Sequence, residues 1–130
     1  DFGETPEQAT AHARREWEIY FPDGRPAAGH RHYHVVDGER RVGTLWLGPM
    51  PDRRPDREWV YYVEVDESLR GKGYGRGAME LAERDALAHG ATELGLNVFG
   101  SNTVARGLYE AMGYRATAIT MAKPLGQPAE

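Results

Sequence analysis

The stretch RGKGYGRG, residues 70–77, combines four glycines with three basic side chains. A glycine inside a helix or strand costs about 0.5–1 kcal/mol relative to alanine, so such a cluster usually has a local reason. One reason is a flexible turn. The other is a backbone that must approach an anionic ligand closely, with amides and cations directed at it.

The flanking segments place this cluster between a strand and a helix. Residues 59–65, WVYYVEV, are aromatic and β-branched and predict a central strand. Residues 75–89 predict a helix with Met79, Ala82 and Ala86 on its inner face. The first N–H groups of a helix have no intrahelical partner and its dipole favours an anion there, so this position favours phosphate binding over a bland turn.

The rest of the chain predicts an α/β fold. We expect a helix at 6–18, hairpin strands at 30–36 and 41–47, a solvated loop at 48–57, a strand at 93–99, a helix at 102–112 and a last strand at 114–121. This order predicts a single mixed, largely antiparallel sheet flanked by helices. Pairing is parallel across the strand–helix–strand unit that contains the glycine cluster.

Length and composition narrow the function classes. The 130 residues suit one domain, residues 1–130, and the net charge of −4 argues against a nucleic-acid-binding surface. The lack of cysteine excludes a thiolate zinc site and a cysteine-linked intermediate, and it suits a cytoplasmic protein. No apolar stretch approaches the ~20 residues that a membrane helix needs, so we expect no membrane partner.

Two nucleotide-binding motifs fit poorly. Gly73-x-Gly75-x-x-Ala78 matches the dinucleotide fingerprint in form, but the preceding strand ends several residues before the first glycine. The following strand, ELGLNVF, carries no acidic residue at its end to hold a ribose, and no GxxxxGK[ST] motif is present.

Two spaced motifs resemble the GNAT superfamily of acetyl-CoA-dependent N-acetyltransferases. Residues 70–75, RGKGYG, match the family's R/Q-x-x-G-x-G/A signature. Asn102, Ala105, Tyr109 and Gly113 match its N-x-x-A-x-x-x-Y-x-x-x-G pattern. The resemblance covers roughly residues 30–125. Family members usually open with a strand and one more helix before the helix at 6–18, and we expect both to be absent from this chain.

The resemblance implies that acetyl-CoA is the co-substrate and that no metal is needed. In the family the glycine turn wraps the pyrophosphate of coenzyme A, and the pantetheine arm pairs with the preceding strand. The residues that this assigns to the cofactor are Val63, Glu64, Val65, Arg70, Gly71, Lys72, Gly73, Tyr74, Gly75, Arg76, Asn102 and Tyr109.

Asn102 and Tyr109 lie two helical turns apart and therefore on one face of the predicted helix. Taken alone, Tyr109 is a packing residue and Asn102 is a helix N-cap. The family pattern instead makes Tyr109 the acid that protonates the departing coenzyme A thiolate. In the family the asparagine often also touches the cofactor, and it can do both.

The general base is less well defined. Some family members carry a glutamate on the strand before the tyrosine helix, where this chain has Asn97, which cannot take a proton but can orient the substrate. Glu64 is the nearest carboxylate on the cofactor strand, with Glu58 at its other end. Each could also be an ordinary strand-flank charge, and water or an already neutral amine remains an alternative.

Several aromatic and imidazole side chains invite other interpretations. His30, His32 and His34 alternate along one predicted strand and would share a face, but without a matching carboxylate a metal site is disfavoured. Tyr61 is a candidate substrate-side residue, either as pocket wall or as a ring stacked on the acceptor.

These observations predict an enzyme that moves acetyl from acetyl-CoA to a primary amine on a small molecule, peptide or protein. Without cysteine, direct attack in a ternary complex is favoured over a cysteine-linked ping-pong route. The rival hypothesis is a non-catalytic acyl-CoA-binding module. A homodimer is left open.

Overall fold

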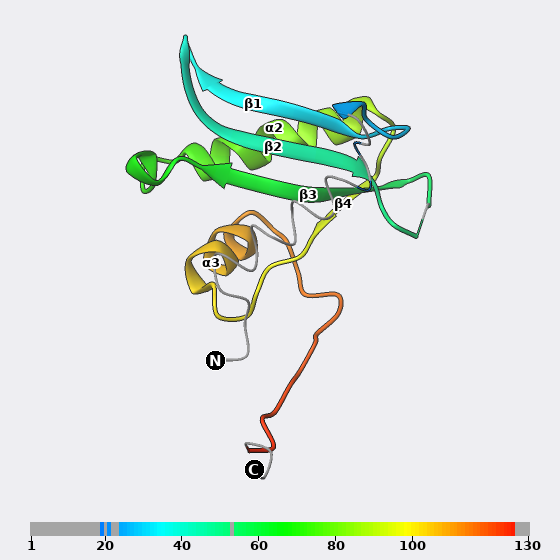
Figure 1. Cartoon of the computed structure of the whole chain (residues 1–130), viewed down its shortest axis with the longest axis vertical. Coiled ribbons are helices and arrows are strands. Elements are labelled where there is room, and N and C mark those ends of the chain that lie inside the picture. Colours follow the sequence, from blue (N-terminus) through cyan, green and yellow to red (C-terminus); the bar gives the residue numbers. More distant parts are fainter. Residues whose placement is uncertain (1–18, 20, 22–23, 53, 127–130) are drawn as a thin grey trace.

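The computed structural model describes residues 19, 21, 24–52 and 54–126, and the helix expected at 6–18 lies outside them. In chain order, the helices and strands of this part are β1 (Arg31–Asp37), β2 (Arg40–Pro49), β3 (Arg57–Val65), the 3₁₀ turn η2 (Glu67–Leu69), α2 (Tyr74–Ala88), β4 (Glu93–Leu96) and α3 (Thr103–Ala111). Figure 1 shows the strands side by side, with α2 behind the sheet.

The sheet has the predicted mixed character. Its strand order is β1-β2-β3-β4, with antiparallel pairing of β1 with β2 and of β2 with β3, and parallel pairing of β3 with β4. Helix α2 makes the crossover that a parallel pair requires. The hairpin turn falls at Gly38, whose positive φ of 64° suits the tight connection.

The core lies between α2 and one face of the sheet. Leu45 and Leu47 of β2 alternate with residues of the opposite face and pack with Met79 and Ala82 of α2. All four are at most 2% exposed, and burying a leucine or methionine side chain contributes roughly 1.5–3 kcal/mol. The inner helix face predicted from the sequence is therefore confirmed.

The opposite face of the sheet carries aromatic side chains. Trp46 is 1% exposed and stacks on Tyr61 at a centroid distance of 4.9 Å, and Phe21 meets Trp46 edge-on at 5.3 Å. The Nε1–H of Trp46 donates to His30 Nδ1 at 3.1 Å. Burial lowers the pKa of His30, which keeps this imidazole neutral and able to accept that hydrogen bond.

Strand β4 is shorter than predicted. Its ladder to β3 runs from Arg57–Glu93 to Val60–Leu96 and ends there, so residues 97–99 are not part of the strand that the sequence predicted at 93–99. Strand β3 continues to Val65. The two strands therefore part after four residue pairs, and the β4-facing edge of residues 61–65 has no strand beside it in the described part of the chain.

The last strand predicted at 114–121 is not formed. A strand needs a neighbouring ladder, and residues 114–126 lie beside none within the described chain. Figure 1 shows this segment, orange to red, running away from the sheet.

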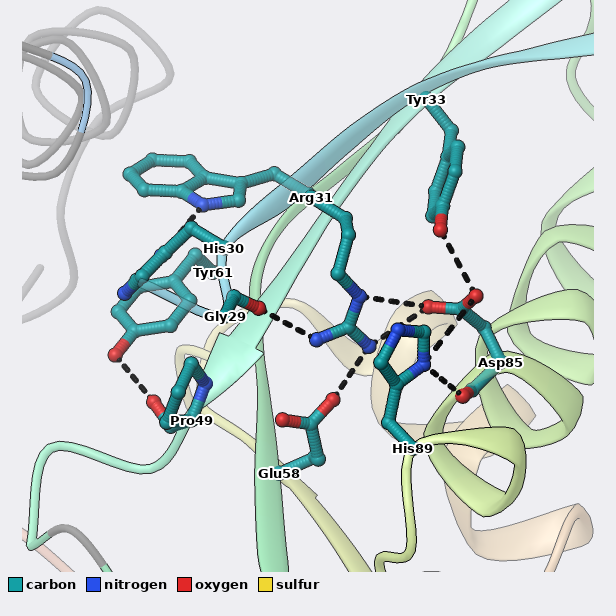
Figure 2. A network of polar contacts seen from close by, with 10 residues as sticks. Gly29, His30, Arg31, Tyr33, Pro49, Glu58, Tyr61, Asp85 and His89 are labelled. Atoms are coloured by element: carbon teal, nitrogen blue, oxygen red, sulfur yellow. Dashed lines mark hydrogen bonds and ion pairs between the residues drawn. The ribbon is translucent and has the colours of Figure 1, made fainter. Parts of the chain in front are cut away.

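A partly buried ion-pair cluster ties β1, β3 and α2 together. Arg31 binds Glu58 at 2.5 Å and Asp85 at 2.7 Å, and its Nη1 donates to the Gly29 carbonyl at 2.6 Å. Tyr33 donates to the same Asp85 at 2.9 Å, as Figure 2 shows. Burial alone would lower the pKa of Arg31, but the hydrogen bonds and charges of Glu58 and Asp85 outweigh it and raise that pKa above its ordinary value.

Arg31→Met should destabilise the protein by about 2–3 kcal/mol, because it leaves two carboxylates facing each other without their cation. Urea unfolding measures this. The matched control is Arg54→Met, whose ion pair with Asp56 at 3.5 Å is about half exposed and should cost less than about 0.5 kcal/mol. Equal stability of the two variants would show that the cluster contributes no more than a surface pair.

Candidate active site

The glycine cluster forms the turn into α2. Gly71 and Gly73 have φ angles of 80° and 85°, a left-handed conformation that other residues adopt only with strain, and Gly73 is the N-cap of α2. No side chain of the described residues caps this helix, so its first backbone N–H groups are available to a ligand. Leu69, 3% exposed, anchors the turn in the core.

The cations predicted around this turn are exposed. The Nε of Arg70 donates to the Val65 carbonyl at 3.2 Å, which holds the arginine next to the end of β3. Arg76 lies 3.7 Å from Glu80 one helical turn on, and Lys72 is exposed. The turn therefore combines free amides with three nearby positive charges.

Tyr74 and Gly75 have packing roles at the start of α2. The Tyr74 hydroxyl donates to Asp37 at 2.6 Å, and this hydrogen bond raises the pKa of Tyr74. A Cβ on Gly75 would lie 3.5 Å from the side chain of Leu108, so α2 and α3 approach closely here. Both residues help place the turn, whatever it binds.

The end of β3 presents its residues to two faces. Val63 and Val65 pack on the core under α2, so Glu64 between them points to the opposite face. Glu64 is exposed and accepts a short hydrogen bond from the Tyr62 hydroxyl. Burial, followed by this bond, raises the pKa of Tyr62 to about 12, so at neutral pH Tyr62 remains the donor.

A β-bulge precedes these residues. Trp46 pairs with Tyr62 and Leu47 with Val60, so the β2–β3 register shifts by one residue at Tyr61. Its hydroxyl donates to the Pro49 carbonyl at 2.7 Å while its ring stacks on Trp46. The structure thus places Tyr61 as a wall of the aromatic face.

Helix α3 carries the second motif. Asn102 is its N-cap, with Oδ1 accepting from the Ala105 N–H at 3.2 Å, as the sequence alone predicted. Tyr109 is half-buried against the core and meets Tyr114 edge-on at 5.9 Å. Among the described residues no hydrogen-bond partner is found for its hydroxyl, and burial raises its pKa.

The structure keeps the two proposed catalytic side chains apart. Tyr109 packs on the α2 face of the sheet, whereas Glu64 points to the aromatic face. Glu64 lies in the part of β3 that has no strand beside it on the β4 side in the described chain, and Tyr109 packs on the same core cluster as Val63 and Val65 on either side of Glu64. Asn97, exposed, directly follows the end of β4 at the same opening.

Other carboxylate and imidazole side chains considered in the sequence analysis have no role in the candidate site. Glu58, weighed above as a second carboxylate on β3, is buried and bound to Arg31, so it is not available as a base. His32 and His34 share the aromatic face as predicted, with ring centroids 5.4 Å apart. Within the described ranges, no group of three His, Cys, Asp or Glu side chains is arranged to hold a metal ion.

A family model for the acetyltransferase (GNAT) family matches residues 2–114. The chain belongs to the GNAT family. It is 32% identical over 122 residues to the uncharacterized N-acetyltransferase YdgE of Bacillus subtilis, covering 93% of this chain and 78% of that protein. A mycothiol acetyltransferase of Jonesia denitrificans is 38% identical over 87 residues, 64% of this chain and 27% of the relative.

The GNAT fold is also found by structural comparison. The crystal structure of YycN from Bacillus subtilis superposes with a TM-score of 0.79 at 29% identity, covering 95% of this chain and 80% of that one. The mixed four-stranded sheet with its two helices is therefore a GNAT fold. None of the helices in the described part of this GNAT domain is both long and apolar enough to cross a membrane.

Sequence reasoning missed two features of this site. It gave Glu64 no partner, although Tyr62 lies two positions earlier on the same strand and alternation places both side chains on one face. It also extended β4 to Phe99, and so did not locate the point at which β3 and β4 separate.

Proposed function

We propose that this GNAT domain transfers an acetyl group from acetyl-CoA to a primary amine by direct attack in a ternary complex. The observation that carries the proposal is the separation of β3 and β4 after Val60 and Leu96, beside a glycine turn with free amides. This separation leaves a β-strand edge that an extended, amide-containing ligand can pair with. The pantetheine arm of coenzyme A is such a ligand.

Coenzyme A would bind in two parts. The amides at the start of α2, with Arg70, Lys72 and Arg76, would hold the diphosphate, since a helix N-terminus and nearby cations favour an anion. The backbone of Val63 to Val65 would pair with the pantetheine arm and bring the thioester to the opening near Tyr109 and Asn97. The N-cap Asn102 would border the same ligand.

The chemistry then needs a neutral amine and a proton donor. The amine nitrogen bonds to the thioester carbonyl carbon, its excess proton leaves to Glu64 directly or through water, and the carbon–sulfur bond breaks. Tyr109 gives its hydroxyl proton to the departing sulfur. A phenol has a pKa of about 10 against about 8.5 for a thiol, and burial raises the pKa of Tyr109 further, so it is protonated at neutral pH.

A panel of small amines and peptides with free amino groups, assayed with acetyl-CoA and a thiol-detecting reagent, tests the function. Release of coenzyme A that depends on one class of amine supports transfer. Tight coenzyme A binding without turnover on any amine would favour the rival, a non-catalytic acyl-CoA-binding module. The aromatic face, with Tyr61 and Trp46, is where we expect acceptor specificity to be set.

Gly73→Ala should weaken coenzyme A binding at least about tenfold. A side chain at a φ of 85° costs about 1–2 kcal/mol, and relief of that strain would turn the amides away from the diphosphate. Calorimetry with coenzyme A measures the affinity. The control is Gly77→Ala, a helical position with open space around the added Cβ, which should bind normally. Normal binding in both variants would contradict the diphosphate assignment.

Glu64→Gln should lower kcat/KM by roughly 10²–10⁴-fold if Glu64 is the base. The pH–rate profile of the variant should lack the acidic limb of the parent profile. Full pH–rate profiles of both proteins measure this. Glu39→Gln, on the exposed hairpin turn, is the control. A loss below about threefold with the limb retained would assign proton removal to water.

Tyr109→Phe should lower kcat by about 10²-fold with near-normal coenzyme A affinity and Tm, because only the hydroxyl is deleted and it has no partner in the described structure. The control is Tyr114→Phe, which loses a 2.7 Å hydrogen bond to Glu83 and should change Tm rather than kcat. A thioester with a more acidic leaving thiol should recover part of the Tyr109→Phe loss. Unchanged kcat in Tyr109→Phe would make Tyr109 a packing residue.

A further inference from the structure

The glycine turn between η2 and α2 has few contacts of its own to hold it in one conformation. Among the described residues, the N–H groups of Gly71, Lys72 and Gly73 donate to no backbone carbonyl. The N-cap glycine offers no side chain to the helix, and a Cβ placed on Gly71 or Gly73 would meet open space. Because glycines lose more conformational freedom on ordering than other residues, this turn needs anchors outside itself.

Two side chains anchor the turn, one on each side. Leu69 before it is 3% exposed in the core. Tyr74 after it packs its ring against the same core, and its hydroxyl donates to Asp37 at 2.6 Å. Asp37 is the last residue of β1, at the hairpin turn. Figure 1 shows the β1–β2 turn and the turn into α2 at the same end of the sheet.

A second contact joins the hairpin to the chain before the glycine turn. The register of the β1–β2 ladder shifts by one residue at Val42, which is fully buried. The carbonyl of Val42 accepts the N–H of Asp66 at 2.9 Å, directly before η2. The hairpin therefore holds the chain on both sides of the turn, at Asp66 before it and at Tyr74 after it.

Tyr74 is the first residue of α2, so its side chain helps to fix where the helix begins. The N–H groups of residues 74–76 lie ahead of the first helical bond, which runs from the Gly77 N–H to the Gly73 carbonyl at 3.0 Å. The hydrogen bond to Asp37 raises the pKa of Tyr74, so the hydroxyl stays a donor at neutral pH. A ligand that meets amides already in place does not have to order them.

The hairpin turn contributes position rather than charge. Asp37 brings a negative charge toward an anion site, which by itself opposes the binding of a diphosphate. The formal charges of this turn cancel, because Asp37 and Glu39 are followed by Arg40 and Arg41. The turn therefore offers an anionic ligand no excess positive charge, and any gain in affinity from it must come through the contact with Tyr74.

We propose that Asp37 is a positioning residue for the coenzyme A diphosphate, acting through Tyr74. The hydrogen bond between them holds the start of α2, and with it the free amides of the turn, in the arrangement that binds the diphosphate. This inference rests on the proposed function, which assigns coenzyme A to the turn. It gives control of cofactor affinity to a residue that lies 37 positions before Tyr74 and outside both sequence motifs.

Calorimetry with coenzyme A on the full chain tests the proposal through two variants at one position. Asp37→Asn removes the charge but keeps an oxygen that can accept from Tyr74, whereas Asp37→Ala removes both. Asp37→Ala should therefore bind coenzyme A about three- to tenfold more weakly than Asp37→Asn, the effect of one hydrogen bond. Asp37→Asn should bind about as tightly as the parent, because it retains the contact and loses a repulsive charge.

Tyr74→Phe completes the comparison, because it keeps the ring in the core and deletes only the hydroxyl. It should bind coenzyme A as weakly as Asp37→Ala does, and in its background Asn and Ala at position 37 should bind equally. The control is Tyr33→Phe, which also loses a hydroxyl–carboxylate bond, to Asp85 at 2.9 Å near the other end of α2. Its affinity for coenzyme A should be normal.

Steady-state kinetics with an accepted amine separate positioning from a general loss of structure. In Tyr74→Phe the KM for acetyl-CoA should rise by the same factor as the dissociation constant, with kcat near the parent value, since no reacting group is touched. Equal affinity of Asp37→Asn and Asp37→Ala, or normal binding by Tyr74→Phe, would overturn the positioning role and leave the proposed function standing. A parent protein that binds no coenzyme A would overturn both.

Discussion

The candidate site depends on the limit of pairing between β3 and β4. Parallel strands joined by a helix pair where the crossover brings them together, and here the ladder ends after Val60 and Leu96. Beyond that point no strand of the described chain lies along the β4-facing edge of β3, and buried backbone groups require partners. The opening is thus a place where the fold leaves main-chain hydrogen bonds for a ligand to complete.

Ion pairs fix the half of β3 that is fully paired. Arg57 at its start binds Glu93 of β4 at 2.6 Å, and Glu58 next to it binds Arg31. Arg31 in turn reaches Asp85 on α2, as Figure 2 shows. Together with the Arg57–Glu93 pair, this holds β1, β3, β4 and α2 together at one end of the sheet. Buried ion pairs add little net stability compared with apolar packing, but they specify one arrangement of the elements that carry them. Residues 61–65 of β3, which border the opening, are therefore positioned by residues 57–60, which pair with β4.

The sequence predicted the parts of the fold that follow from local pattern. The hairpin at Gly38, the inner face of α2 with Met79 and Ala82, and the N-cap Asn102 each rest on spacing within a few residues, and the structure confirms them. It did not predict the Arg31 cluster or the end of β4, because both depend on which segments meet in space. The strand predicted at 114–121 has the right local pattern but no neighbouring strand among the residues that the structure describes, so its propensity alone produces no ladder.

The two proposed catalytic side chains lie in environments suited to opposite tasks. Tyr109 is half-buried on the core side of the sheet, where desolvation disfavours the phenolate and keeps a proton ready for a leaving sulfur. Glu64 is exposed on the aromatic face, with a Tyr62 hydroxyl hydrogen-bonded to it, where a carboxylate can exchange protons with water. Because the opening in the sheet separates the two side chains, a donor and an acceptor could enter from different faces and meet there. Because the sheet lies between them, Glu64 does not take the Tyr109 proton directly. In the proposed reaction, the base takes its proton from the amine and the acid gives its proton to the sulfur, both through the bound substrates.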